Sequence, residues 1–247
     1  MSQPIRDQTC LLSVVLPAYN EGKKIQLHIP LLKAKLDSLG ISYETIIVND
    51  GSTDDTLSKA KPYESEHIRI FSYDQNKGKG FAVNFGMRQA RGDYRIFMDA
   101  DLSTSLDFIE PFLAVLKRDD VDMVIGTRKA NISLQKRKQP AYRRFLGNLY
   151  THISGVMIGR FLTDFTCGFK MYTRQSADII FSRQRINNWA FDSELICIAA
   201  QHGLRIKEVP VIWSNDPDTK VRLWRDSITS FFALFMIRIN AVLGRYR

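Results

Sequence analysis

The chain has 247 residues, of which 45% are hydrophobic and 25% charged, and this composition excludes a largely disordered protein. The formal net charge is +9 at pH 7, which favours an anionic partner such as phosphate groups, acidic lipid or nucleic acid. No run reaches the roughly 18–20 apolar residues that cross a bilayer, so we expect no membrane-spanning helix.

In the first half of the chain, short runs rich in Val and Ile alternate with segments of helical spacing. Strands are predicted at residues 11–16, 43–48, 67–73, 94–98 and 121–126. Helices are predicted at residues 25–39, 54–64 and 80–91. Pro30 lies inside the first helix, which therefore either kinks there or begins near it. This order predicts an α/β fold: a mostly parallel sheet flanked by helices, with ligands at the carboxyl ends of its strands.

The second half begins with a basic, Gln-containing segment, KANISLQKRKQ, which is typical of a loop. Further helices are predicted at residues 140–158, 174–181 and 191–201, and a further strand at residues 204–213. Because no linker or repeat separates the two halves, we expect one domain over residues 1–221.

The last segment, residues 222–247, predicts an amphipathic helix with a wide apolar face. Its apolar positions are Ile228, Phe231, Phe232, Phe235, Ile239 and Val242. Arginines flank or interrupt this face. Two interpretations stay open: the helix packs on the core, or it lies on a membrane surface, where apolar burial combines with attraction to anionic lipid.

Positive charge gathers in two parts of the sequence. Residues 128–144 hold seven basic side chains and no acidic one, and residues 220–247 hold six against Asp226 alone. A clustered excess indicates an anionic partner, whereas any single Lys is more often part of a solvated face.

Polar loops follow the first three predicted strands. In PAYNEG, Tyr19 is placed to face a nucleotide base or ribose, and Glu21 to accept hydrogen bonds from ribose hydroxyls. In VNDGSTD, Asp50 at the strand end is a candidate for the same task, while Asp54 is better explained as a helix cap. NKGKG opens the next helix, and its glycines, lysines and helix N-terminus favour a phosphate or ribose contact.

Asp99-Ala100-Asp101 follows the fourth strand. Two carboxylates one residue apart at a strand end repel each other unless a cation neutralises them. Strand alternation aims both to the same side, and oxygen ligands suit Mg²⁺ or Mn²⁺, which bridge diphosphates. The motif therefore predicts a divalent cation site.

In this order the loops resemble the family 2 glycosyltransferases, through LSVVLPAYNE, IIVNDGSTDDT, NKGKGFAVNFG and YRIFMDADLS. The resemblance continues through VIGTRK, DFTCGFKMYTRQSA, WAFDSELICIA and VPVIW, then DTKVRLWRDS, and covers residues 11–238. The later motifs are most similar to polyprenyl-phosphate hexosyltransferases, and closer to dolichyl-phosphate glucosyltransferases than to the mannosyl enzymes. The resemblance implies the nucleotide-diphospho-sugar transferase (GT-A type) fold.

It also implies an activity: inverting transfer of a hexose, with glucose favoured, from a nucleotide sugar to a polyprenyl (dolichyl) phosphate. UDP-glucose is the favoured donor, and Mg²⁺ or Mn²⁺ the cofactor. Two alternatives stay open, a polyprenyl-phosphate mannosyltransferase that uses GDP-mannose and a family 2 transferase that acts on a sugar hydroxyl. A hydroxyl acceptor needs a base, for which Asp192 is the candidate; its other role is a carboxylate at a helix start.

The family's functional residues carry over to matching positions. The expected donor-binding residues are Pro17, Tyr19, Glu21, Asp50, Lys79, Asp99 and Ala100. Asp101 is the expected principal metal ligand, with Asp99 and Ser103 beside it. The expected catalytic residues are Asp99, Asp101, Arg128 and Asp192, with Arg128 near the phosphates. The residues expected around the acceptor phosphate are Arg143, Arg144, Lys220 and Arg222.

Two other classes of function compete with this one. A sugar-1-phosphate nucleotidyltransferase wants a Gly-rich basic loop after the first strand, where PAYNEG supplies one glycine and an acid. A nucleic-acid binder is indicated by charge alone, and because no binding motif accompanies it we expect no nucleic-acid partner.

The cysteines and the N-terminus bear on location. Cys10, Cys167 and Cys197 stand far apart without metal-ligand spacing, which favours reduced thiols in a reducing compartment. The segment MSQPIRDQTC lacks the apolar run of a signal peptide. We expect a cytoplasmic protein, peripheral on the cytoplasmic face of a membrane, with the acceptor lipid reached through the C-terminal helix.

Overall fold

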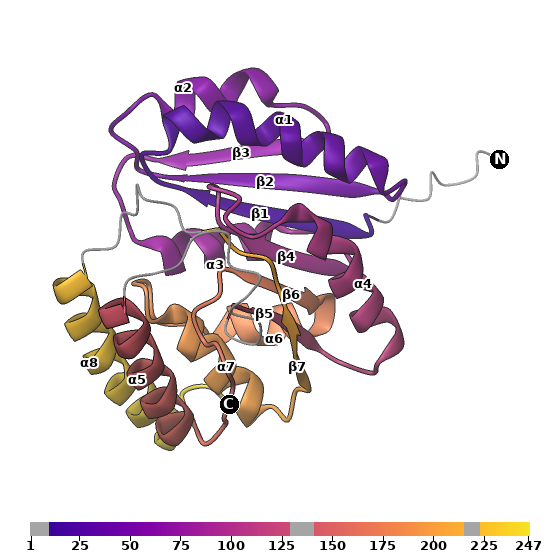
Figure 1. The fold of residues 1–247 in the computed structure, drawn as a ribbon. Coiled ribbons are helices and arrows are strands. Elements are labelled where there is room, and N and C mark those ends of the chain that lie inside the picture. The colour runs from indigo at the N-terminus through magenta and orange to yellow at the C-terminus, as the bar shows by residue number, and fades with distance from the viewer. Residues whose placement is uncertain (1–9, 129–140, 215–222) are drawn as a thin grey trace.

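The computed structural model describes the backbone of residues 10–128, 141–214 and 223–247, and the side chains of residues 10–128, 145–214 and 229–247. Seven strands form one sheet in the order β3-β2-β1-β4-β6-β5-β7 (Figure 1). They are β1 (Leu12–Ala18), β2 (Tyr43–Asp50), β3 (Ile68–Tyr73), β4 (Tyr94–Met98), β5 (Met123–Thr127), β6 (Phe169–Thr173) and β7 (Ile206–Pro210). The first half and the second half of the chain thus share a single sheet.

The sheet is mostly parallel, which confirms the predicted α/β fold. Only β6 runs against its neighbours, β4 and β5, among the paired strands of the described residues. The sequence did not predict β6, because its five residues, FKMYT, neither alternate in polarity nor form an apolar run. Lys170 is the second residue of this strand and is fully buried.

Eight α-helices accompany the sheet within the described residues. They are α1 (Gly22–Ser38), α2 (Thr56–Ala60), α3 (Lys79–Gln89), α4 (Ile109–Arg118), α5 (Ala141–Ile158), α6 (Arg174–Arg183), α7 (Phe191–Gln201) and α8 (Leu223–Val242). The helix predicted at residues 54–64 is instead the short α2 followed by a 3₁₀ turn, Lys61–Tyr63, where Pro62 cannot donate a helical hydrogen bond. The last helix ends at Val242, short of the expected residue 247, and Gly244 then turns the chain with φ of 68°.

Helix α1 runs through Pro30 without ending there. A proline at this position removes the donor that the carbonyl of Gln26, four residues earlier, would use. The hydroxyl of Tyr63 donates to that carbonyl at 3.0 Å instead. A hydrogen bond from a distant turn therefore replaces the one that the helix loses.

Helices cover both faces of the sheet. Side chains of α1 and α4, such as Ile25 and Phe112, pack with Val14 and its neighbours on one face. Side chains of α3 and α7, such as Val83 and Leu195, pack with residues of the other face. This alternation of buried side chains along the strands builds two cores, one on each side.

Beyond α7, helices α5 and α8 lie side by side at one end of the molecule (Figure 1). Leu234 and Ile237 of α8 are buried against the core. The hydroxyl of Tyr246, past the helix end, donates to Glu194 of α7 at 2.7 Å. Within the described residues, no helix combines the length and apolar character required to traverse a bilayer.

Candidate active site at the carboxyl ends of the strands

The polar loops singled out in the sequence meet at one edge of the sheet. The loop after β1 bonds to the loop after β2, with the Asn20 amide donating to the Ser52 hydroxyl at 2.9 Å. The loop after β2 contacts the start of α3, and α3 contacts the loop after β4 through an ion pair between Lys79 and Asp99. The parallel strands β1, β2, β3 and β4 thus bring residues from four loops together.

Asp99 is held by the side chain and backbone around it. Its carboxylate pairs with the Lys79 ammonium, which also lies 5.2 Å from the centre of the Trp189 ring. A Cβ atom at Gly168 would stand 2.2 Å from Asp99 Oδ2, so only glycine leaves room for the carboxylate. Burial lowers the pKa of Lys79, but nearby carboxylates, led by Asp99 and then Asp192, outweigh burial and raise it.

Asp101 is the second carboxylate of the motif. The Ser103 amide donates to its Oδ1 at 2.9 Å. Burial, followed by the negative charge of Asp99, raises the pKa of Asp101. Both effects disfavour the charged carboxylate, and a bound cation would relieve both.

The two carboxylates fit a divalent ion that also binds substrate. Among the described residues, no group of three or more His, Cys, Asp and Glu side chains is arranged to hold a metal ion. Mg²⁺ and similar ions are often bound through one or two carboxylates together with substrate phosphates, so Asp99 and Asp101 suit such an ion. The Ala100 carbonyl between them lies 2.8 Å from His28 Nδ1, which fixes the backbone of the motif.

Two amides of the NKGKG loop have protein partners, and the predicted phosphate or ribose contact of this loop stays a prediction. The amides of Lys77 and Gly78 donate to the Asp50 carboxylate at 2.8 and 3.0 Å. The Tyr73 hydroxyl and the Asn76 amide group complete four donors to the same carboxylate, at 2.8 and 2.9 Å. The anion at this helix start is therefore Asp50 itself, even though burial raises its pKa.

The other residues predicted to bind the nucleotide-sugar donor lie nearby and are more exposed to solvent than Asp50. Tyr19 is 37% exposed, and Pro17 is half-buried in β1. Glu21 precedes α1 and forms an ion pair with Lys24 at 3.4 Å. Asp54 accepts from the first amides of α1 and α2, at 3.1 Å from Gly22 and 2.9 Å from Thr56, in line with its predicted capping role.

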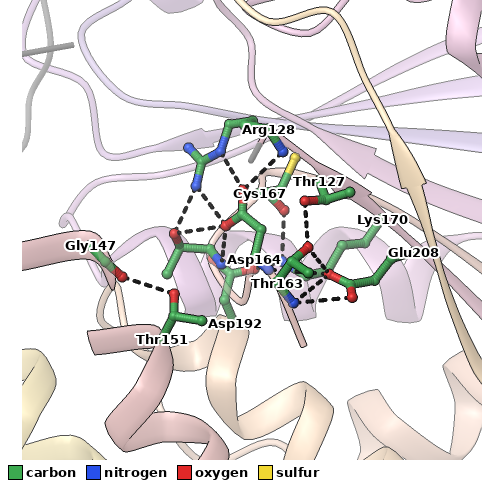
Figure 2. Close-up of polar contacts among 11 residues, drawn as sticks. Thr127, Arg128, Gly147, Thr151, Thr163, Asp164, Cys167, Lys170, Asp192 and Glu208 are labelled. Carbon is green, nitrogen blue, oxygen red and sulfur yellow. Dashed lines mark hydrogen bonds and ion pairs between the residues drawn. The ribbon is translucent and has the colours of Figure 1, made fainter. Parts of the chain in front are cut away.

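Arg128 is clamped by a buried carboxylate that sequence reasoning missed (Figure 2). Its Nε and Nη2 donate to the two oxygens of Asp164 at 2.7 and 2.8 Å. Nη2 also donates to the Thr166 hydroxyl at 2.8 Å, and the guanidinium lies 5.5 Å from the centre of the Trp213 ring. Burial lowers the pKa of Arg128, but the charge of Asp164 outweighs burial and raises it. The signal in the sequence was DFT, a motif quoted for the resemblance but given no role.

Asp192 lies in the first turn of α7 and pairs with the fully buried Lys170 (Figure 2). The Lys170 ammonium also donates to the Cys167 carbonyl at 2.7 Å. Burial raises the pKa of Asp192, and the two lysines, Lys170 and Lys79, counteract it. The side chains of Asp99, Lys79, Asp192 and Lys170 thus form a row in which the charges alternate.

The remaining predicted residues divide into two groups. Ser103 stays close to the cation motif, and its carbonyl accepts from the Ser214 amide at 2.9 Å. The side chains of the predicted acceptor-phosphate residues, Arg143, Arg144, Lys220 and Arg222, lie outside the described residues.

The family model of Glycosyl transferase family 2 matches residues 13–181. The chain is also similar to proteins named dolichyl-phosphate beta-glucosyltransferase. It is 34% identical to one from Trichomonas vaginalis, over 86% of this chain and 68% of that protein. It is 33% identical to one from Dictyostelium discoideum, over 96% and 76%, and 31% identical to one from Saccharomyces cerevisiae, over 98% and 78%.

Two solved structures share the fold. Glucosyl-3-phosphoglycerate synthase from Mycobacterium tuberculosis, in complex with Mn²⁺, UDP and phosphoglyceric acid, matches with a TM-score of 0.64 at 20% identity, over 96% of this chain and 78% of that one. Mannosyl-3-phosphoglycerate synthase from Rubrobacter xylanophilus matches with a TM-score of 0.69 at 19% identity, over 96% and 76%. These likenesses confirm the expected GT-A type of fold.

Proposed function

Because the chain belongs to glycosyl transferase family 2, we propose that it transfers glucose from UDP-glucose to a polyprenyl phosphate such as dolichyl phosphate, with inversion at the anomeric carbon. The observation that carries the proposal is the similarity, over most of the chain, to proteins named for that reaction. UDP as the carrier draws support from the shared fold with a synthase solved with UDP-glucose and Mn²⁺.

A divalent cation, Mg²⁺ or Mn²⁺, would be held by Asp101 and Asp99, and when bound it would neutralise charge on the diphosphate leaving group. Lys79 keeps a positive charge beside Asp99. The bidentate contact with Asp164 fixes the direction of the Arg128 guanidinium, which suits a residue that binds phosphate oxygens.

The contacts of Asp192 favour a phosphate acceptor over a sugar hydroxyl. A phosphate monoester is already anionic near neutral pH, because its second pKa is about 6, so no strong base is required. A sugar hydroxyl would need a base that is free to take its proton. Asp192 is buried and bonded to Lys170, which fits a residue that orients its neighbours.

The first prediction concerns the cation motif. Saturating UDP with Mn²⁺ should raise the melting temperature by about 5–10 °C, because a ligand at 100 times its Kd adds about 2.7 kcal/mol to stability. Asp101→Asn should abolish this rise, and Asp119→Asn, at an exposed carboxylate paired with Lys207, should keep it. Thermal melts with and without UDP and Mn²⁺ measure both. An unchanged melting temperature in the wild type would refute the proposed donor site.

Transfer itself is tested with radiolabelled UDP-glucose and GDP-mannose, each offered with a polyprenyl phosphate. We expect label from UDP-glucose alone in the organic-extractable product. Label from GDP-mannose would reassign the donor, and label only in a water-soluble product would reassign the acceptor. We also propose that the protein acts from the cytoplasmic face as a peripheral membrane protein, since its acceptor is a lipid.

A further inference from the structure

Helix α8 exposes a broad apolar stripe. Its exposed large apolar residues, with the one that follows its end, are Phe232, Phe235, Met236, Ile239, Val242 and Leu243. Spacings of three and four residues set them on one side of the helix, opposite the buried Leu234 and Ile237. Phe232 and Val242 are 69% and 71% exposed, so the stripe is open along its length. The helix is therefore apolar on two sides, one against the core and one facing outward.

Helix α5, beside it, has a matching stripe. Phe145, Leu149 and Val156 are exposed and share one side of the helix at spacings of four and seven residues. A different side of the helix carries Tyr150, which packs edge-on against Phe231 of α8 with ring centres 5.6 Å apart. The two helices are thus fixed to each other through their inner sides. We call the outward stripes of both helices the α5–α8 face.

The charges around the α5–α8 face are positive. Arg238 borders the stripe of α8, and Arg245 and Arg247 follow its end; all three are exposed. Residues 229–247 of the described chain contain no Asp or Glu. A second copy pressed on this part of the face would bring arginines against arginines, and residues 229–247 hold no carboxylate to offset them. A bilayer with anionic headgroups offers the complementary charge and an apolar interior.

We propose that the α5–α8 face binds the surface of an anionic bilayer, with the apolar stripes entering the headgroup region and the arginines contacting lipid phosphates. The statement that the bilayer also holds the lipid acceptor rests on the proposed function. The binding of the α5–α8 face to a bilayer does not. The occupant is a membrane surface, and both helices contribute to the contact.

Helix α5 also borders a cavity. This cavity of about 250 Å³ is lined by Asn148, Thr151 and His152 of α5 and by residues 161–163. Phe161 at its rim is 71% exposed. The hydroxyl of Thr163, one of the lining residues, lies 2.6 Å from that of Thr127, the residue before Arg128. The lining of the cavity thus includes the residue before Asp164 of the Arg128 clamp.

The test is flotation with phosphatidylcholine vesicles made with and without phosphatidylserine. Wild-type protein should float with the anionic vesicles. Phe235→Ser with Ile239→Ser should reduce the bound fraction about tenfold or more, because both apolar contacts are lost. Leu149→Ser with Val156→Ser should reduce it similarly. The matched control is Leu27→Ser with Leu31→Ser, two exposed leucines four residues apart on α1, which should float like the wild type.

Three results would overturn the inference. Wild type that stays in solution with both kinds of vesicle is the first. Stripe variants that float as well as the control pair are the second. The third is a wild-type dimer in sedimentation that the Phe235→Ser, Ile239→Ser pair converts to monomer without any flotation, which would assign the face to a second copy.

A soluble acceptor separates this inference from the proposed function. With UDP-glucose and a short-chain, water-soluble isoprenoid phosphate, the stripe variants should react at the wild-type rate. With the long-chain acceptor in anionic vesicles, they should be about tenfold slower or more. If the wild type floats but transfers glucose to neither acceptor, the proposed function fails and the binding surface stands.

Discussion

At the residue scale, the candidate site depends on buried charges that bind one another. Lys170 is fully buried, and its ammonium is satisfied by Asp192 and the Cys167 carbonyl. Burying either charge alone costs several kcal/mol, so each keeps the other tolerable. The pair lies next to Lys79, which holds Asp99 of the cation motif. The Lys170–Asp192 pair therefore helps to fix the positions of Lys79 and Asp99.

We expect Lys170→Met to lower the free energy of unfolding by about 3–5 kcal/mol, because Asp192 would be left buried without this cation. Lys170→Met with Asp192→Leu should be more stable than Lys170→Met alone, since no charge then stays unpaired. Urea unfolding of both variants measures the difference. A loss below about 1 kcal/mol for Lys170→Met would show that the charge of Asp192 is not held by this pair.

In the ion pairs Lys170–Asp192 and Arg128–Asp164, the sequence predicted a role for one residue and not for its partner. Asp192 and Arg128 stood in motifs that imply a role, so both were singled out. Asp164 precedes β6 and Lys170 lies within it, and the fold brings them to Arg128 and Asp192, which are distant in the sequence. A contact set by sheet topology leaves no periodic signal in the chain.

At the element scale, α1 shows how a helix tolerates an interior proline. The Gln26 carbonyl loses its helical donor at Pro30 and gains the Tyr63 hydroxyl at 3.0 Å. Tyr63 belongs to the 3₁₀ turn after α2, so the contact also fastens α2 to α1. The hydrogen bond that compensates for Pro30 in α1 is therefore also a tertiary contact between α1 and the turn after α2.

We expect Tyr63→Phe to cost about 0.5–1.5 kcal/mol in the wild type, because one hydrogen bond is lost. In a Pro30→Ala background the same change should cost much less, since the introduced alanine would supply the amide that the Gln26 carbonyl lacks. A double-mutant cycle by chemical unfolding measures this coupling. Equal costs in the two backgrounds would mean that the hydroxyl does not replace the hydrogen bond lost at Pro30.

Most elements of the fold could be predicted, and the exceptions have physical reasons. Strand β2 carries its own signal through the consecutive apolar residues Ile46, Ile47 and Val48, all fully buried. Strand β6 contains Lys170, whose burial is tolerated because it pairs with the buried Asp192. The polarity pattern of these five residues therefore gives no indication of a strand. Helix α4 has a strong apolar side, with Ile109, Phe112, Leu113 and Leu116 buried, yet no helix was assigned there.

At the scale of the whole molecule, four carboxyl groups, those of Asp50, Asp101, Asp192 and Glu194, have pKa values above the ordinary range. Burial is the main cause for all four. A carboxyl group whose pKa is raised by folding binds protons more tightly in the folded state. Stability therefore falls as pH rises from the ordinary values of 3.8 and 4.5 through the raised ones.

We expect the melting temperature to rise by about 2–4 °C when the pH is lowered from 7 toward the ordinary carboxyl value of 4.5 at constant ionic strength. Surface aspartates such as Asp37 and Asp107 have lowered pKa values, so their opposite effect begins only as the pH approaches 3.8. Thermal melts across this range measure the slope. Glu194→Gln should flatten it, and a melting temperature that falls steadily on acidification would contradict the assignment.

The buried hydroxyl of Tyr246 has a consequence for the chain's last turn. Glu194 binds that hydroxyl at 2.7 Å and, with its other oxygen, the amides of Arg185 and Ile186 at 3.0 and 2.7 Å. Gln184, one residue earlier, donates to the Gly80 carbonyl at the start of α3, beside Lys79. Tyr246 is thus linked through Glu194 and Gln184 to the start of α3. Removing the residues after α8 should therefore loosen the backbone that positions Lys79.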